Sequence, residues 1–348
     1  MVTTPTLASF GHETVKQLGR SAIGGRPLLI VLGEYSNFPA FSTFHPREYY
    51  EHLGSGTPTP PFSTDNPVNP ASLSDYFRDN SNGRFWFDPV KVVGPIQLGV
   101  YENDPGPEAR SAGILARVAT QVPEFFVDAD SNRDHVVAFD ELCVLLFENI
   151  TGAFPANRDN NPVHFGDETI RVHVAGAGPL TPFYQIAHEL SHSLGTVDMY
   201  NTGLGNNLLT LMGAYPFFAN DQGSVHLDMW HKVVLGWAEP RVFRLSSSDS
   251  TFVGTSSDGA ILLWDETRRE NEYFIVERRR PHAGPAHKYD DSFPADGVLI
   301  WRVQQGAANV AHMGAPDMTP GGSGVWRSGQ QTPALKWSNG QETGVYIR

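Results

Sequence analysis

Residues 188–198 read HELSHSLGTVD, a segment whose spacing fits a metal site on a helix. Thr181 and Pro182 come shortly before it, and a threonine cap followed by proline in the first turn is typical of a helix start. On that helix His188 and His192 lie four residues apart and share one face, so both imidazoles can bind one ion. The alternative is that both histidines lie on a solvated helix and bind nothing.

Three more residues of this segment fit a catalytic metal site. Glu189 is near enough along the helix to reach a water molecule bound to the ion. Gly195 stands where the helix should end, because glycine adopts the left-handed conformation that reverses the chain. The reversal would bring Asp198 back as a third ligand. Two imidazoles and one carboxylate leave one tetrahedral position for water, which is typical of catalytic rather than structural zinc sites.

The extended motif HELSHSLGTVDMY resembles the zincin signature with aspartate as third ligand, as in the immune inhibitor A family of secreted zinc metalloproteases. Further along the chain, LTLMGAYP resembles the Met-turn of that family, with Met212 as a packing floor under the metal. HLDMWHKVVLGWAEP is similar to the closing helix of the catalytic domain, and WSNGQETGVYI resembles a final hairpin. The similarity covers most of residues 27–347 in the family's order. By this resemblance the sequence is expected to lack the family's secretion signal and propeptide and to end within a strand at Arg348.

This resemblance implies a zinc-dependent endopeptidase, a hydrolase that cleaves protein or peptide substrates. Zinc would be held by His188, His192 and Asp198, and Glu189 would activate the zinc-bound water and later protonate the leaving amine. By the same resemblance the protein is expected to be secreted. It is also expected to be a monomer. Two alternatives remain open: a catalytically silent binding or surface module on the same fold, and a metal-dependent hydrolase that acts on other bonds.

The expected fold class is α+β, with a zincin-like catalytic domain followed by a β-rich, sandwich-like domain. We place an N-terminal extension at residues 1–24, the catalytic domain at 25–240 and the β-rich domain at 241–348, truncated at its C-terminus. The boundary lies at Pro240 because short β-type runs separated by turn residues follow it. These runs include AILLWD, EYFIVERRR, GVLIWRV and TGVYIR.

Four local patterns complete the expected secondary structure. PLLIVLG at residues 27–33 predicts a buried strand, and Ser72 with Asp75 forms a capping box before a short helix. The alternating segment TIRVHVA at residues 169–175 predicts one half-exposed strand, either a plain sheet strand or an edge strand that pairs with substrate. A helix is expected to start near Asp140, with Cys143 buried within it.

Residues 130–141 read DSNRDHVVAFDE and fit the calcium loop of an EF-hand. The expected calcium ligands are Asp130, Asn132, Asp134, the carbonyl of Val136 and Glu141. One residue departs from the motif, since His135 occupies the tight-turn position that is normally glycine. We therefore expect weaker calcium binding than in an ordinary EF-hand. The alternative is a solvated acidic loop.

Composition excludes several classes of partner and site. The net charge of −13 disfavours nucleic acid and anionic membranes, and no apolar run approaches the roughly 18 residues of a membrane span. The N-terminus has no signal-peptide pattern. The chain has one cysteine, which excludes an internal disulfide and cysteine-rich metal sites, so a metal must be bound by histidine and carboxylates.

Overall fold

A computed structural model describes residues 22–57, 72–102, 104–150, 156–199, 209–213, 225–245, 260–268, 271–280, 289, 295–305, 311–314 and 324–348. The described chain divides into two compact units, Ala22–Thr196 and Val197–Arg348. The N-terminal extension expected at residues 1–24 lies mostly outside the described residues. The boundary that we place at Pro240, between the catalytic domain and the β-rich domain, stays a prediction.

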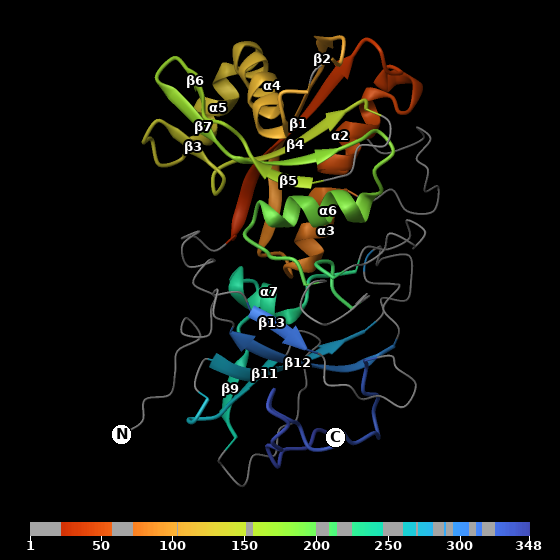
Figure 1. Ribbon diagram of the computed structural model, residues 1–348, viewed down its shortest axis with the longest axis vertical. Coiled ribbons are helices and arrows are strands. Elements are labelled where there is room, and N and C mark those ends of the chain that lie inside the picture. Colours follow the sequence, from red (N-terminus) through yellow and green to blue (C-terminus); the bar gives the residue numbers. More distant parts are fainter. Residues whose placement is uncertain are drawn as a thin grey trace. The chain divides into compact units, whose positions relative to one another are not determined.

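The unit Ala22–Thr196 is built on a five-stranded sheet with the strand order β2-β1-β4-β8-β5 (Figure 1). All neighbouring strands are parallel except β5, which runs antiparallel to β8 at the edge. A second sheet has the order β3-β7-β6. The strands are β1 (Gly24–Tyr35), β2 (Phe85–Gly99), β3 (Val136–Ala138), β4 (Cys143–Glu148), β5 (Ala156–Asp159), β6 (Val163–Phe165), β7 (Glu168–Arg171) and β8 (His173–Ala177).

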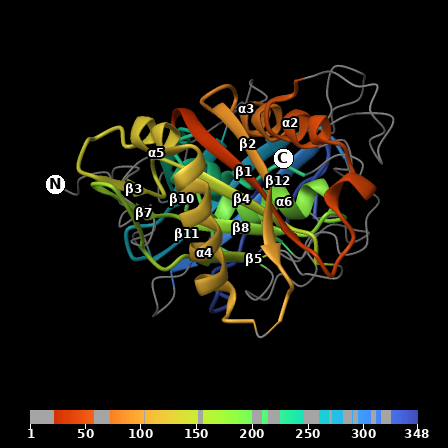
Figure 2. The same ribbon diagram turned by 90° about the horizontal axis from the view of Figure 1, so that it is seen from above.

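Helices cover both faces of the five-stranded sheet. They are η2 (Phe41–Thr43), α2 (Arg47–Ser55), α3 (Leu73–Asn80), α4 (Pro107–Gln121), α5 (Pro123–Ala129) and α6 (Phe183–His192). Figure 1 shows α4 and α5 on one face and α3 and α6 on the other, and Figure 2 shows α4 lying across the strands. Alternate residues of β1 point to opposite faces of the sheet. Leu29 belongs to the hydrophobic core cluster that includes residues of α4, whereas Ile30 lies against Gly54 of α2.

The strand predicted at residues 27–33 is confirmed as the centre of β1, and the N-cap of the predicted capping box is confirmed at α3. Its N-cap Ser72 accepts a hydrogen bond from the N–H of Asp75. The helix expected near Asp140 is wrong: Cys143 opens the strand β4, whose six residues are all buried between β1 and β8. A strand buried on both faces has no alternation, and its short apolar run cannot be told from a buried helix by pattern.

The single strand predicted at residues 169–175 is also wrong. The chain breaks at Val172 into β7 and β8, which belong to different sheets. Neither is an edge strand, because β7 lies between β3 and β6 and β8 lies between β4 and β5. The half-exposed alternation holds only for β7, whereas four of the five residues of β8 are buried.

The unit Val197–Arg348 contains helix α7 (Met229–Val234) and a five-stranded sheet. The strands are β9 (Arg241–Arg244), β10 (Ala260–Trp264), β11 (Glu272–Arg279), β12 (Gly297–Gln305) and β13 (Ala311–Gly314), in the order β13-β12-β11-β10-β9. Three of the predicted runs are thus confirmed as β10, β11 and β12. The fourth, TGVYIR, forms no regular strand, but the N–H of Leu335 donates to the carbonyl of Val345 across a turn.

The described chain is therefore a mixed helix and sheet protein. Among the residues that the structure describes, no helix combines the length and the apolar character needed to cross a bilayer.

Candidate functional site

Helix α6 carries the two histidines of the predicted metal site on a short, well-anchored scaffold. It follows the buried strand β8, and the ring of Phe183 in its first turn makes an edge contact with Tyr76 of α3. The N-cap is Pro182, not Thr181, whose hydroxyl instead accepts a hydrogen bond from the N–H of Gly178. Thr181 therefore fixes the turn that leads into the helix rather than capping it.

Helix α6 ends at His192, three residues before Gly195, the glycine at which the sequence predicts the helix end. After His192 the chain forms a turn in which the N–H of Gly195 donates to the His192 carbonyl, at 2.9 Å. Gly195 has a φ of 99°, a conformation that side chains with a Cβ rarely adopt. The chain thus turns at Gly195, in the segment that follows the end of α6.

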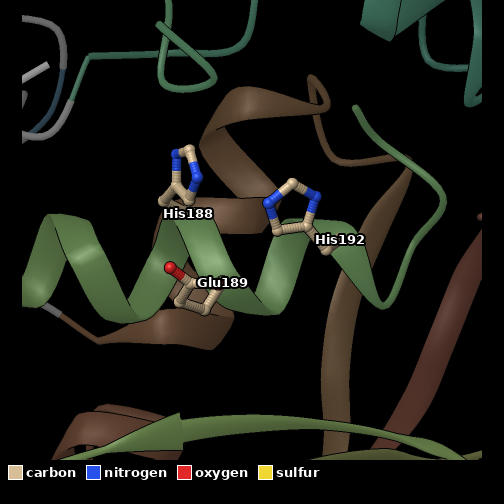
Figure 3. A group of neighbouring side chains, drawn as sticks. All are labelled: His188, Glu189 and His192. Atoms are coloured by element: carbon tan, nitrogen blue, oxygen red, sulfur yellow. The ribbon is translucent and has the colours of Figure 1, made fainter. Parts of the chain in front are cut away.

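The described residues bring His188, Glu189 and His192 together. One ligand atom from each lies within 4.8 Å of the others, and all three side chains are half-buried. The two imidazole rings have centroids 5.0 Å apart and an interplanar angle of 87°. Figure 3 shows both rings rising from one side of α6, with the Glu189 carboxylate on the adjoining side. This is the arrangement expected for two ligands and a nearby base.

A backbone carbonyl orients the His192 ring. Its Nδ1 lies 3.0 Å from the carbonyl oxygen of Thr196. Because a carbonyl can only accept, Nδ1 carries a proton, and in the neutral ring the lone pair then lies on Nε2. Metal-binding histidines are held in this way, with one nitrogen donating to the protein and the other available to the ion.

Asp198 belongs to the other compact unit and is half-buried there. Its role as the third ligand stays a prediction. Met212, expected under the metal, is fully buried, and its carbonyl accepts a hydrogen bond from the N–H of Met199.

The acidic loop at residues 130–141 folds around its own carboxylates. Asp130 accepts hydrogen bonds from the N–H groups of Asp134 and His135. Glu141 closes the loop by accepting from the N–H groups of Ser131 and Asn132. The predicted ligands Asp130, Asp134 and Glu141 have ligand atoms within 4.8 Å of one another.

Two other predicted ligands, and the residue that breaks the motif, have clear positions in this loop. Asn132 accepts from the N–H of Asp134 through its side-chain oxygen, and Val136 begins β3. His135 has a φ of 64°, so it adopts the glycine-like conformation that its position in the motif requires. Its side chain turns towards Glu168, with Nδ1 3.1 Å from Oε1.

Sequence reasoning missed Glu168 and a buried pair in the other unit. Asp228 and His231 are fully buried, with Oδ2 and Nδ1 2.7 Å apart. The Thr210 hydroxyl donates to the same oxygen, and Nε2 of His231 accepts from the N–H of Val197. The available signal was the spacing alone, since an N-cap aspartate and a histidine three residues later meet on one side of a first turn.

The comparisons with known proteins add no family. The chain matches no protein-family model and no curated protein sequence.

Proposed function

We propose that this protein is a zinc-dependent endopeptidase. The observation that carries the proposal is the convergence of His188, Glu189 and His192 on α6, with ligand atoms within 4.8 Å. The donor set fits zinc, since imidazole nitrogen and carboxylate oxygen are its usual ligands. The hydrogen bond at His192 supports the same assignment, because in the neutral ring it puts the proton on Nδ1 and the lone pair on Nε2.

In this proposal each residue has one task. His188 and His192 would hold zinc, with Asp198 as the third ligand supplied by the chain beyond Gly195. Zinc, when bound, polarises the scissile carbonyl and acidifies the attacking water. Glu189 would take the proton of that water and return it to the leaving amine nitrogen.

The sheet topology supports a zincin-like catalytic domain. A mostly parallel sheet leads through its buried strand β8 directly into α6, and one antiparallel strand, β5, forms the adjacent edge. An extended peptide can add to such an edge by backbone hydrogen bonds. We therefore move the expected substrate strand from residues 169–175 to β5, and keep the sandwich-like character of residues 241–348 as part of the proposal.

Calcium binding at Asp130, Asn132, Asp134, Val136 and Glu141 remains part of the proposal. The backbone pattern around Asp130 supports it, and the glycine-like φ of His135 means that the loop already has the turn it needs. We also propose that the protein acts outside the cell as a monomer, where millimolar calcium would fill a weak site.

The test is Glu189→Gln, measured by casein cleavage and by zinc content. The substitution keeps the size of the side chain but removes the proton acceptor, so cleavage should fall by about 10²–10⁴-fold while zinc stays bound. Glu124→Gln, at an exposed position in α5, is the matched control and should cleave normally. Wild-type turnover in a zinc-replete Glu189→Gln protein would refute the mechanism. A silent binding module would instead hold zinc in the wild-type chain without cleaving casein.

A further inference from the structure

The residue that breaks the calcium motif belongs to a second cluster of metal-binding side chains. His135 precedes β3 and Glu168 opens β7, and these two strands pair in parallel with Val136 opposite Thr169. The N–H of Thr169 donates to the His135 carbonyl at 2.9 Å. The pairing therefore brings together two side chains that are 33 residues apart in sequence.

Asp130 completes this cluster. It offers a ligand atom within 4.8 Å of one from His135 and one from Glu168, and it is only 7% exposed. The Nδ1 atom of His135 and the Oε1 atom of Glu168 are 3.1 Å apart. Ligands of a tetrahedral ion with bonds of about 2.0–2.2 Å are separated by roughly 3.3–3.6 Å, so only a small adjustment would place an ion between them.

The Glu168 carboxylate gives an independent indication of a ligand. Its side chain is 9% exposed, and its Oε2 atom is buried with no hydrogen-bond partner among the described residues. A buried carboxylate oxygen without a partner is costly, because desolvation removes its water without replacing it. The other oxygen, Oε1, points to His135. A cation bound by this carboxylate would offset the cost of burying Oε2 without a hydrogen-bond partner.

The donor types indicate the class of ion. The set formed by Asp130, Asp134 and Glu141 contains only oxygen, which suits calcium, whereas His135 adds an imidazole nitrogen. Nitrogen together with carboxylate oxygen favours zinc and similar transition metals over calcium and magnesium. We propose that Asp130, His135 and Glu168 bind a zinc-like transition-metal ion, at a site separate from the one on α6. Because the two sets share Asp130, calcium in the loop and zinc at this site depend on the same carboxylate.

One substitution separates the two ions. His135→Gly removes the nitrogen donor and at the same time restores the glycine of the calcium motif. It should therefore abolish zinc binding at this site while calcium binding is kept or improved. Glu168→Gln retains the shape of the side chain but removes its charge, and it should weaken zinc binding without touching any of the calcium ligands.

Zinc is counted in the full chain by competition with a chromogenic chelator, and Co²⁺ absorption reports whether nitrogen is a ligand. The wild-type chain should bind two zinc ions, and His135→Gly and Glu168→Gln should each bind one. His164→Ala is the matched control, since His164 is exposed on β6 of the same small sheet and lies outside the cluster. It should bind two ions. Circular dichroism and melting curves establish that each variant is folded.

The double variant His188→Ala/His192→Ala distinguishes this inference from the proposed function. It should still bind one zinc ion, which is then lost when His135→Gly is added. If zinc in the double variant is absent, or is unchanged by both His135→Gly and Glu168→Gln, the second site does not exist. If the double variant binds as much zinc as the wild type, the site on α6 is refuted instead.

Discussion

Two histidine–carboxylate pairs in this chain have similar geometry but different surroundings. In the unit Ala22–Thr196, His135 lies 3.1 Å from Glu168 and its side chain is 65% exposed. In the unit Val197–Arg348, His231 lies 2.7 Å from Asp228 and both side chains are 0% exposed. Every nitrogen of His231 has a protein partner, whereas Glu168 keeps an orphaned oxygen.

Side chains that bind a ligand differ from side chains that hold the fold in how much of their hydrogen-bonding capacity the protein uses. A closed pair uses all its hydrogen-bonding capacity within the protein and has nothing to offer an ion. In an open pair at least one side chain is half-buried or exposed, as His135 is and as the histidines of α6 are. Substitutions in the open sites should therefore change binding and activity, and substitutions in the closed pair should change stability.

The largest effect should come from His192→Ala, an open-site change. Losing this ligand should remove zinc from α6, and casein cleavage should fall on the order of a thousandfold or more, since the metal supplies several kcal/mol of transition-state stabilisation. The melting temperature of the zinc-free protein should change little, because the side chain is only half-buried. Zinc content, cleavage and melting are measured together. Retained zinc and cleavage would show that His192 is not a ligand.

Asp228→Ala tests the closed pair. It leaves His231 and the Thr210 hydroxyl buried without their acceptor, which should lower the free energy of unfolding by about 3–5 kcal/mol. Glu342→Ala is the control, because the ion pair with Lys336 is 56% and 61% exposed and should contribute less than about 1 kcal/mol. Urea unfolding gives both values. Equal, small effects would mean that burial does not distinguish the two kinds of pair.

Acid should destabilise the closed pair in a defined range. Burial by itself would raise the pKa of Asp228, but His231 and Thr210 lower it from its ordinary 3.8 to about 2. A lowered pKa contributes stability above the unfolded value, and that contribution is lost as pH falls from 3.8 towards about 2. At roughly 1.4 kcal/mol per pH unit the share of Asp228 is about 2 kcal/mol.

The measurement is the free energy of unfolding against pH for the wild type and Asp228→Asn. Subtracting the two curves removes the other carboxylates, which titrate in both proteins. The difference should shrink between pH 3.8 and about 2. A difference that stays constant over this range would show that Asp228 is not the titrating group.

The smallest effect concerns calcium in His135→Gly. A residue with a Cβ in the left-handed conformation costs about 1–2 kcal/mol, and glycine removes that cost. Because the loop already holds this turn, the calcium-free protein should gain about 1–2 kcal/mol of stability, and the calcium dependence of the melting temperature at fixed zinc should be retained. Asp130→Ala/Glu141→Ala is the control and should show no calcium shift. If calcium changes the melting temperature of neither the wild type nor His135→Gly, the loop is only an acidic surface.

The features that depend only on residues near one another in the sequence were predicted correctly. The N-cap at Ser72, the pair His188 and His192, and the turn at Gly195 after α6 each depend on residues within one or two helical turns. Their spacing fixes their geometry wherever the helix lies in the fold. For this reason the centre of the candidate site could be placed from the sequence.

The predictions that were wrong, and the residue that was missed, depend on pairing between strands that are distant in the sequence. The apolar run at β4 is a strand because β1 and β8 supply its hydrogen bonds, and neither partner is visible from the run itself. The break at Val172 has the same origin, since β7 and β8 pair with different sheets. Glu168 joins His135 only through the pairing of β3 with β7, so no spacing rule could have found it.

The position of Cys143 makes its thiol a natural reporter of transient opening in the five-stranded sheet of the unit Ala22–Thr196, the central sheet of that unit. This thiol is the only one in the chain, it is 0% exposed in β4, and burial raises its pKa. A thiol reagent can therefore label it only when the central sheet transiently separates, so the labelling rate measures how often that sheet opens. A ligand that binds only the closed sheet slows labelling in proportion to its occupancy. A mass-spectrometric time course of labelling thus follows the opening of the sheet that supports α6, and no residue has to be substituted to introduce a reactive thiol.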